Sequence, residues 1–136
     1  MNSILIFVDW FEPGFKGGGP IRSIAGFIYN LKNNFTFNVV TSISDYNTTE
    51  AYNNIKANEW LFYDDNVEVL YLNKRLSFSM FNNILNYKDF NWVYLNSFFS
   101  YNFSILPYVF SRFSKTRKNN FLIAPRGEFN PERLAV

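Results

Sequence analysis

The sequence feature that most constrains the fold is a short apolar run followed by three glycines and a helical pattern. The apolar run covers residues 4–8, and the glycines stand at positions 17–19, directly before Pro20. Proline suits the first turn of a helix because it has no N–H group to leave unpaired. Apolar residues then recur at helical spacing over residues 21–31. The segment therefore predicts a strand, a glycine turn and an amphipathic helix.

The glycine turn is a candidate binding element. Gly17, Gly18 and Gly19 can take positive φ angles and let another molecule approach the main chain closely. Unpaired N–H groups and the helix dipole at such a helix start favour a phosphate or another anion. Arg22, in the first turn, adds a fixed positive charge. The spacing matches neither the dinucleotide fingerprint nor the P-loop, so the alternative interpretation is a tight turn without a ligand.

The composition excludes several kinds of chemistry. The chain of 136 residues contains no cysteine and no histidine, so it has no disulfide, no cysteine nucleophile and no histidine base or metal ligand. Hydrophobic residues make up 48% of it, which is enough for a packed core, and the length predicts a single domain over residues 1–136. The net charge of +2 predicts no general affinity for nucleic acid.

Strand-like and helix-like segments alternate along the chain. Strands are expected over residues 3–9, 35–41, 67–72, 90–95 and 121–124, and helices over residues 20–32, 77–86 and 98–114. Ser77 is expected to cap the second helix, and helical spacing places Phe78 and Phe113 on the core faces of the second and third helices. Pro107 is expected to kink or divide the last helix. Residues 60–63 are expected to pack on the sheet edge, and the turn at residues 64–66 to hold two solvated aspartates. The alternation predicts an α/β fold, a parallel sheet with helices on both faces.

Ligands of such sheets bind at the carboxyl ends of the strands, where the strand order switches. Four connections of this chain are expected at that edge: the glycine turn, the polar loop of residues 42–58 with Asp45, the pair Asn96 and Ser97, and the loop with Arg126, Gly127 and Glu128. A long polar loop is often functional, although a surface loop without a ligand is an equal alternative for residues 42–58. The convergence predicts a binding cleft.

Three motifs in this order resemble a known family. They are GGGPIRS at residues 17–23, YLNSFFS at residues 94–100 and APRGEFNP at residues 124–131. Together they resemble the N-terminal domain of the retaining GT-B glycosyltransferases of family 4. The resemblance implies a Rossmann-like, flavodoxin-like domain that forms the acceptor-side half of a GT-B fold. In this family a second domain binds the donor nucleotide and carries a Glu-x7-Glu element. The resemblance therefore implies a fragment, or a subunit completed by a separate C-terminal domain or partner.

The implied reaction moves a sugar from a nucleotide-sugar donor to a hydroxyl of a glycan or lipid-linked acceptor, with retention and without a metal or other cofactor. The glycine turn would lie near the donor diphosphate, and Arg22 would neutralise phosphate charge or hold the turn. Asn96 and Ser97 would line the cleft where many relatives have a histidine. Arg126 would contact an anion or the acceptor and Glu128 would bind sugar hydroxyls, unless the two form a local ion pair.

The cellular location and the rival function follow from simple patterns. The first apolar run is short and is interrupted by Asp9, unlike a secretory signal, so a cytoplasmic location is expected. The phenylalanine-rich helix over residues 98–114 ends among basic residues, which is typical of a helix on the inner face of a membrane; core packing with a solvated basic rim is the favoured alternative. The rival function is a non-catalytic flavodoxin-like module that binds a small ligand or a partner.

Overall fold

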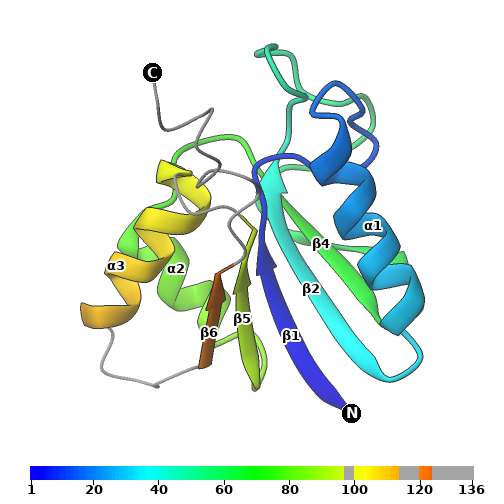
Figure 1. Cartoon of the computed structure of the whole chain (residues 1–136). Helices are drawn as coiled ribbons and strands as arrows, with labels where there is room; N and C mark the ends of the chain where they lie inside the picture. Colours follow the sequence, from blue (N-terminus) through cyan, green and yellow to red (C-terminus); the bar gives the residue numbers. More distant parts are fainter. Residues whose placement is uncertain (97–99, 114–119, 124–136) are drawn as a thin grey trace, which may run out of the picture.

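The computed structural model describes residues 1–96, 100–113 and 120–123, and these form a sheet with helices on both faces (Figure 1). The elements are β1 (Asn2–Phe7), α1 (Gly19–Leu31), β2 (Phe35–Ser42), β3 (Trp60–Asp64), β4 (Val67–Leu72), α2 (Phe78–Leu85), β5 (Trp92–Leu95), the π-helical segment η1 (Tyr101–Ile105), α3 (Leu106–Phe113) and β6 (Asn120–Ile123). The change from η1 to α3 lies just before Pro107, so the helix is divided there as the sequence predicts.

The six strands form one sheet in the order β3-β4-β2-β1-β5-β6. The neighbours from β4 to β6 are parallel, and β3 alone pairs antiparallel, with β4. From β1 the chain builds the sheet outward through β2 and β4, and it then returns to the other side of β1 for β5 and β6. The strand order therefore switches between β1 and β5. This topology confirms the predicted α/β, Rossmann-like fold.

The connection from β2 to β4 differs from the prediction that strands and helices alternate throughout. Among the described residues it holds the loop of residues 43–59 and the edge strand β3, and no helix. Asn47, Asn54 and Asn58 all have φ angles near +60°, a left-handed conformation that interrupts a right-handed helix. Asn66 has the same conformation in the turn that joins β3 to β4. Residues 60–63 thus lie at the sheet edge, as expected, and do so as a paired strand.

Two hydrophobic clusters hold the helices against the sheet. Alternate residues of β1 belong to opposite clusters because side chains alternate along a strand. Ile6 packs with Ile24 of α1 on one face, and Leu5 packs with Phe81 of α2 on the other. The described part of α3 lies on the α2 side (Figure 1). The core therefore fixes which helix covers which face of the sheet.

At the ends of the helices, sequence patterns predict the cap of α2 correctly but assign too many residues to the core. Ser77 caps α2 as predicted, since its hydroxyl oxygen accepts a hydrogen bond from the Met80 nitrogen at 3.2 Å. Phe78 and Phe113 were expected on the core faces of their helices, and this is wrong, because their exposed fractions are 40% and 70%. They are the first residue of α2 and the last residue of α3. Helical spacing predicts the side of the helix on which a side chain lies, but at the end of a helix that side can extend past the sheet and be exposed.

Candidate functional site at the carboxyl edge of the sheet

The glycine turn lies at the carboxyl end of β1 and begins α1. Gly18 is the N-cap residue, with φ 73° and ψ −131°, a conformation that favours glycine strongly. Among the described residues, no atom beyond the turn's own neighbours lies within 4 Å of where a Cβ would stand on Gly18 or Gly19. A Cβ on Gly17, in contrast, would lie 3.3 Å from the Trp10 ring and 2.9 Å from Ile21. Within the described part of the chain, two of the three glycines therefore face open space, and Gly17 serves close packing.

Asp45 holds the loop that leads into this turn. Asp45 is 7% exposed, and its carboxylate accepts hydrogen bonds from the backbone nitrogens of Phe15 at 3.0 Å, Lys16 at 3.1 Å and Tyr46 at 2.8 Å. Burial acts to raise the pKa of Asp45, but these N–H groups outweigh it and keep the pKa below its usual range. The structure thus brings Asp45 to the glycine loop, as expected, where its oxygens bind the protein backbone.

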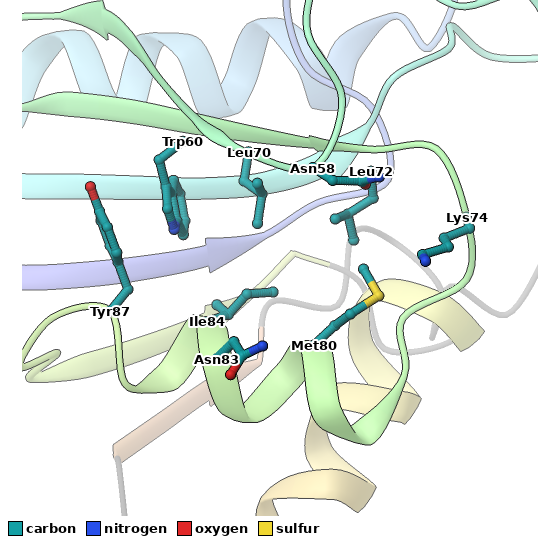
Figure 2. Close-up of a pocket in the computed structure, with 9 residues that line it drawn as sticks. All are labelled: Asn58, Trp60, Leu70, Leu72, Lys74, Met80, Asn83, Ile84 and Tyr87. Atoms are coloured by element: carbon teal, nitrogen blue, oxygen red, sulfur yellow. The ribbon is translucent and has the colours of Figure 1, made fainter.

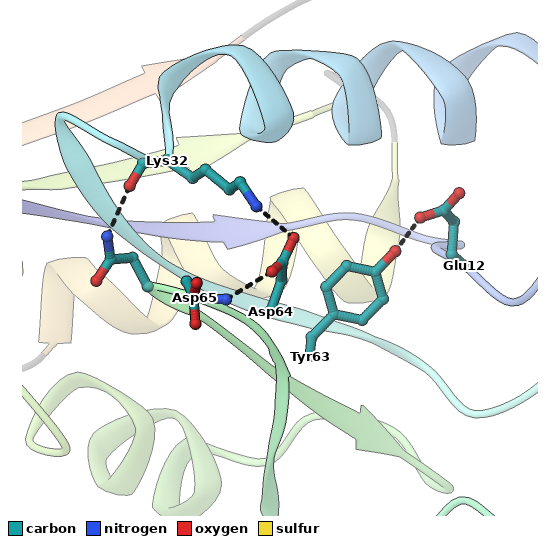
Figure 3. Close-up of polar contacts among 6 residues, drawn as sticks. Glu12, Lys32, Tyr63, Asp64 and Asp65 are labelled. Carbon is teal, nitrogen blue, oxygen red and sulfur yellow. Dashed lines mark hydrogen bonds and ion pairs between the residues drawn. The ribbon is translucent and has the colours of Figure 1, made fainter.

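Aromatic residues also hold the loop between β1 and α1 in place. Phe11 is fully buried, and the Tyr71 hydroxyl donates a hydrogen bond to the Glu12 carbonyl oxygen at 2.5 Å. The Tyr63 hydroxyl donates to the Glu12 carboxylate (Figure 3). Burial raises the pKa of Tyr52, whose ring packs edge-on against Tyr71, to about 12. The loop between β1 and α1 is therefore preorganised by fixed contacts.

Three polar residues mark the point where the strand order switches. Asp9 follows β1, and its Oδ1 accepts a hydrogen bond from the Ser100 hydroxyl at 2.6 Å. Asn96 follows β5, is 3% exposed, and donates its backbone N–H to the Phe7 carbonyl oxygen at 3.1 Å. Asn96 thus lies at the predicted edge. Sequence reasoning missed Asp9 and Ser100, although an acidic residue directly after a buried strand was a usable signal.

A polar hollow of about 280 Å³ opens at the carboxyl ends of β2 and β4. Its lining comprises Ser42, Ile43, Ser44, Thr49, Ala51, Leu72, Asn73, Lys74, Asn102 and Phe103. Half of these described residues come from β2 and the polar loop after it, for which the sequence leaves a role in binding and a surface loop without a ligand as equal alternatives. Among the described lining residues, Lys74 alone carries a charged side chain. Hydroxyl and amide groups with one ammonium suit an oxygen-rich ligand.

The remaining predicted residues are either exposed or outside the described part. Arg22 is exposed in the first turn of α1. Ser97, Arg126, Gly127 and Glu128 lie outside the described residues, so their predicted meeting with the glycine turn stays a prediction.

Two properties bear on metals and membranes. Within residues 1–96, 100–113 and 120–123, no group of three or more Asp, Glu, His or Cys side chains is arranged to hold a metal ion. No helix in that part of the chain has the length and apolar character needed to cross a bilayer.

The fold and the arrangement of its loops define a Rossmann-like α/β domain whose candidate ligand site lies at the carboxyl edge of the sheet. Comparison of the chain with protein-family models, with curated proteins and with solved structures finds no significant match.

Proposed function

We propose that this chain is the acceptor-side half of a retaining GT-B glycosyltransferase similar to family 4, which transfers a sugar from a nucleotide-sugar to an acceptor hydroxyl. The observation that carries the proposal is Gly18 at the start of α1, which has a positive φ angle, is open to approach among the described residues, and follows the strand where the strand order switches. The motifs at residues 17–23, 94–100 and 124–131 support it from the sequence.

The geometry narrows what the glycine turn contributes. The Gly18 nitrogen donates to the Phe15 carbonyl oxygen at 3.1 Å, the Gly17 N–H acts on the Asp45 carboxylate and helps to lower its pKa, and Pro20 has no N–H group. Within the described part of the chain, the Gly19 N–H is the one group of this turn left to a ligand. Together with Arg22 and the positive end of the α1 dipole, it would stabilise charge on a leaving diphosphate.

The polar hollow gives the acceptor a place on the same edge. Its hydroxyl and amide side chains, among them Ser44, Thr49 and Asn73, match the hydrogen bonds that sugar hydroxyls make. In this proposal the loop of residues 42–58 selects the acceptor, and the glycine turn contacts the donor. The larger part of the donor site belongs to a second domain or subunit.

A non-catalytic ligand-binding module is the second candidate. It is favoured by the internal use of Asp45 and of two of the three glycine N–H groups, since a diphosphate site usually presents several N–H donors. Such a module would use the hollow alone, without a nucleotide-sugar.

The test is a titration of the ¹⁵N-labelled chain, followed by NMR. Under the transferase proposal, UDP-glucose or GDP-mannose shifts the amide signal of Gly19, and oligosaccharide acceptors shift those of Ser44 and Asn73. Gly26, in the middle of α1, is the internal control that should not move. Acceptor shifts without any nucleotide-sugar response at Gly19 favour the module instead.

Two further observations bear on the same choice. A reading frame that continues or adjoins the gene and encodes Glu-x7-Glu supports the transferase. Because the donor site is expected elsewhere, the purified chain of 136 residues should show no turnover. Measurable sugar transfer by this chain alone would overturn the half-enzyme proposal.

A further inference from the structure

An apolar groove of about 350 Å³ runs between α2 and the β3–β4 side of the sheet (Figure 2). Met80 and Ile84, one helical turn apart, form its helix side. Leu70 and Leu72 form its strand side. At one end Trp60 stacks on Tyr87, with ring centroids 4.9 Å apart and an interplanar angle of 18°. The groove is therefore a mostly apolar channel with an aromatic end.

The groove adjoins the polar hollow at the carboxyl edge. Both are lined by Leu72 and Lys74, so the two spaces are neighbours; together they are called the cleft, with an apolar part toward Trp60 and a polar part in the hollow. Lys74 projects from the loop after β4 over the groove (Figure 2). It is exposed, and none of the described residues pairs with it. Its ammonium therefore stands at the junction of the apolar and polar parts.

The polar part of the cleft offers hydrogen-bond donors to a ligand. The Asn73 side-chain oxygen accepts a hydrogen bond from the Asn58 amide at 2.9 Å. The Asn102 side-chain oxygen accepts one from the Leu76 nitrogen at 2.8 Å. Each asparagine therefore has its NH₂ group left for a ligand. None of the described residues that line the groove or the hollow is acidic. Two amide groups and an ammonium, with no carboxylate among the described lining residues, favour an anion.

We propose that this cleft binds an alkyl phosphate with a single chain. The alkyl chain of the ligand lies in the groove between Met80 and Leu70, and its phosphate lies against Lys74, Asn73 and Asn102. A phosphate monoester fits this end because it brings negative charge and three acceptor oxygens. The groove volume is near the lower limit of ligand pockets, about 300 Å³, which selects one chain over two. The proposal is independent of sugar transfer, because it requires neither a nucleotide nor the glycine turn.

Isothermal titration calorimetry of the protein with decyl phosphate, below its critical micelle concentration, tests the proposal. Three other ligands serve as controls: decanol lacks the charge, inorganic phosphate lacks the alkyl tail, and decanoate has a carboxylate in place of the phosphate. We expect one equivalent of decyl phosphate to bind at least about tenfold more tightly than each of these, a difference of about 1.4 kcal/mol. No binding of decyl phosphate, or decanol binding equally well, would overturn the proposal. Equal binding of decanoate would overturn the phosphate assignment.

Variants separate the two ends of the cleft. Lys74→Gln should weaken decyl phosphate about tenfold and leave decanol unchanged. Met80→Trp, which fills the groove, should weaken both. Lys56→Gln is the matched control: Lys56 is exposed, lines neither space, and among the described residues pairs only with Glu59, in a surface ion pair at 3.3 Å. Both Lys variants change surface side chains and should fold normally. Undiminished decyl phosphate binding by Lys74→Gln would contradict the assignment of the head group.

Discussion

Both carboxylate oxygens of Asp45 lie 3.1 Å from the backbone nitrogen of Lys16. The residues are far apart in the sequence, yet they meet because β1 and β2 are parallel neighbours and their carboxyl ends share one edge. Asp45 thereby fixes the segment that leads into Gly17 and Gly18. The polar loop after β2 shapes the glycine turn as well as lining the hollow beside it.

Replacing Asp45 by asparagine should destabilise the protein. The amide keeps the shape but places an NH₂ group or a weaker acceptor against the N–H groups of Phe15 and Lys16. Since hydrogen bonds to a charged group contribute about 1.5–3 kcal/mol each, we expect a loss of about 2 kcal/mol or more in the free energy of unfolding. Urea denaturation at neutral pH measures it. Asp65→Asn, at an exposed position, is the control and should change little.

The same variant makes a prediction about pH. The pKa of Asp45 is lowered on folding, because backbone N–H groups favour the charged carboxylate against the opposing effect of burial. Its contribution is therefore fully present above its ordinary pKa of 3.8 and is lost as the pH falls through the lower value of the folded state. The stability gap between the wild type and Asp45→Asn should shrink below this pH. An undiminished gap in strong acid would contradict the hydrogen-bonded, ionised carboxylate.

Gly18 and Gly26 form a natural pair for testing the turn. Gly18→Ala puts a side chain at a φ of 73° and should cost about 1–2 kcal/mol. Gly26 lies within α1, and a Cβ there would meet no described atom within 4 Å apart from the backbone of its own helix, so Gly26→Ala should stabilise by about 0.5–1 kcal/mol. Denaturant unfolding of both variants gives the comparison. A neutral Gly18→Ala would show that the turn relaxes easily to another conformation.

Much of the fold could be predicted because it follows local patterns. The apolar strands, the helix after Pro20 and the Ser77 cap all have signatures within a few residues. The edge strand β3 was harder to assign, because its antiparallel pairing depends on the turn at Asn66 and on residues 43–59 not being helical. Local patterns specify individual helices and strands, whereas the pairing of strands in the sheet depends on contacts between residues far apart in the sequence.

The sequence predicted where the candidate site lies, but not which of its atoms are available to a ligand. Strand order gathers loops at one edge, so Asp45 and the glycine turn were expected together, and they are. Which atoms remain available is a different matter. The use of the Gly17 and Gly18 N–H groups inside the loop, and the meeting of two pockets at Lys74, depend on tertiary contacts that no spacing in the sequence encodes.

Lys32 and Asp64 connect the end of α1 to β3 (Figure 3). Their side chains approach to 2.6 Å, so the expectation that both aspartates at residues 64–65 are solvated is wrong for Asp64. The hydrogen bond with Asp64 raises the pKa of Lys32, and the same bond lowers the pKa of Asp64. The Asp64 contribution is lost as the pH falls below 3.8, and the Lys32 contribution is lost as the pH rises above 10.5.

Asp64→Asn should therefore lower the melting temperature slightly between these two pH values, and less at either extreme. The effect should be small, because the side chains are 20% and 43% exposed, and molar salt should reduce it by screening. Thermal melting at several pH values, with and without salt, measures it. A loss that is independent of pH and salt would mean that packing, and not the ion pair, is the contribution of Asp64.

Ser100 connects the two sides of the strand-order switch. Its hydroxyl donates to Asp9 after β1 and accepts from the Phe103 nitrogen at 3.2 Å in η1. Ser100→Ala removes both bonds, and loss of such a cap typically costs about 0.5–2 kcal/mol. Ser79→Ala, at an exposed position of α2, is the matched control. Hydrogen exchange should speed up at the Phe103 amide of Ser100→Ala and not in the control. Unchanged exchange there would mean that η1 is held by packing of the buried Phe103 ring alone.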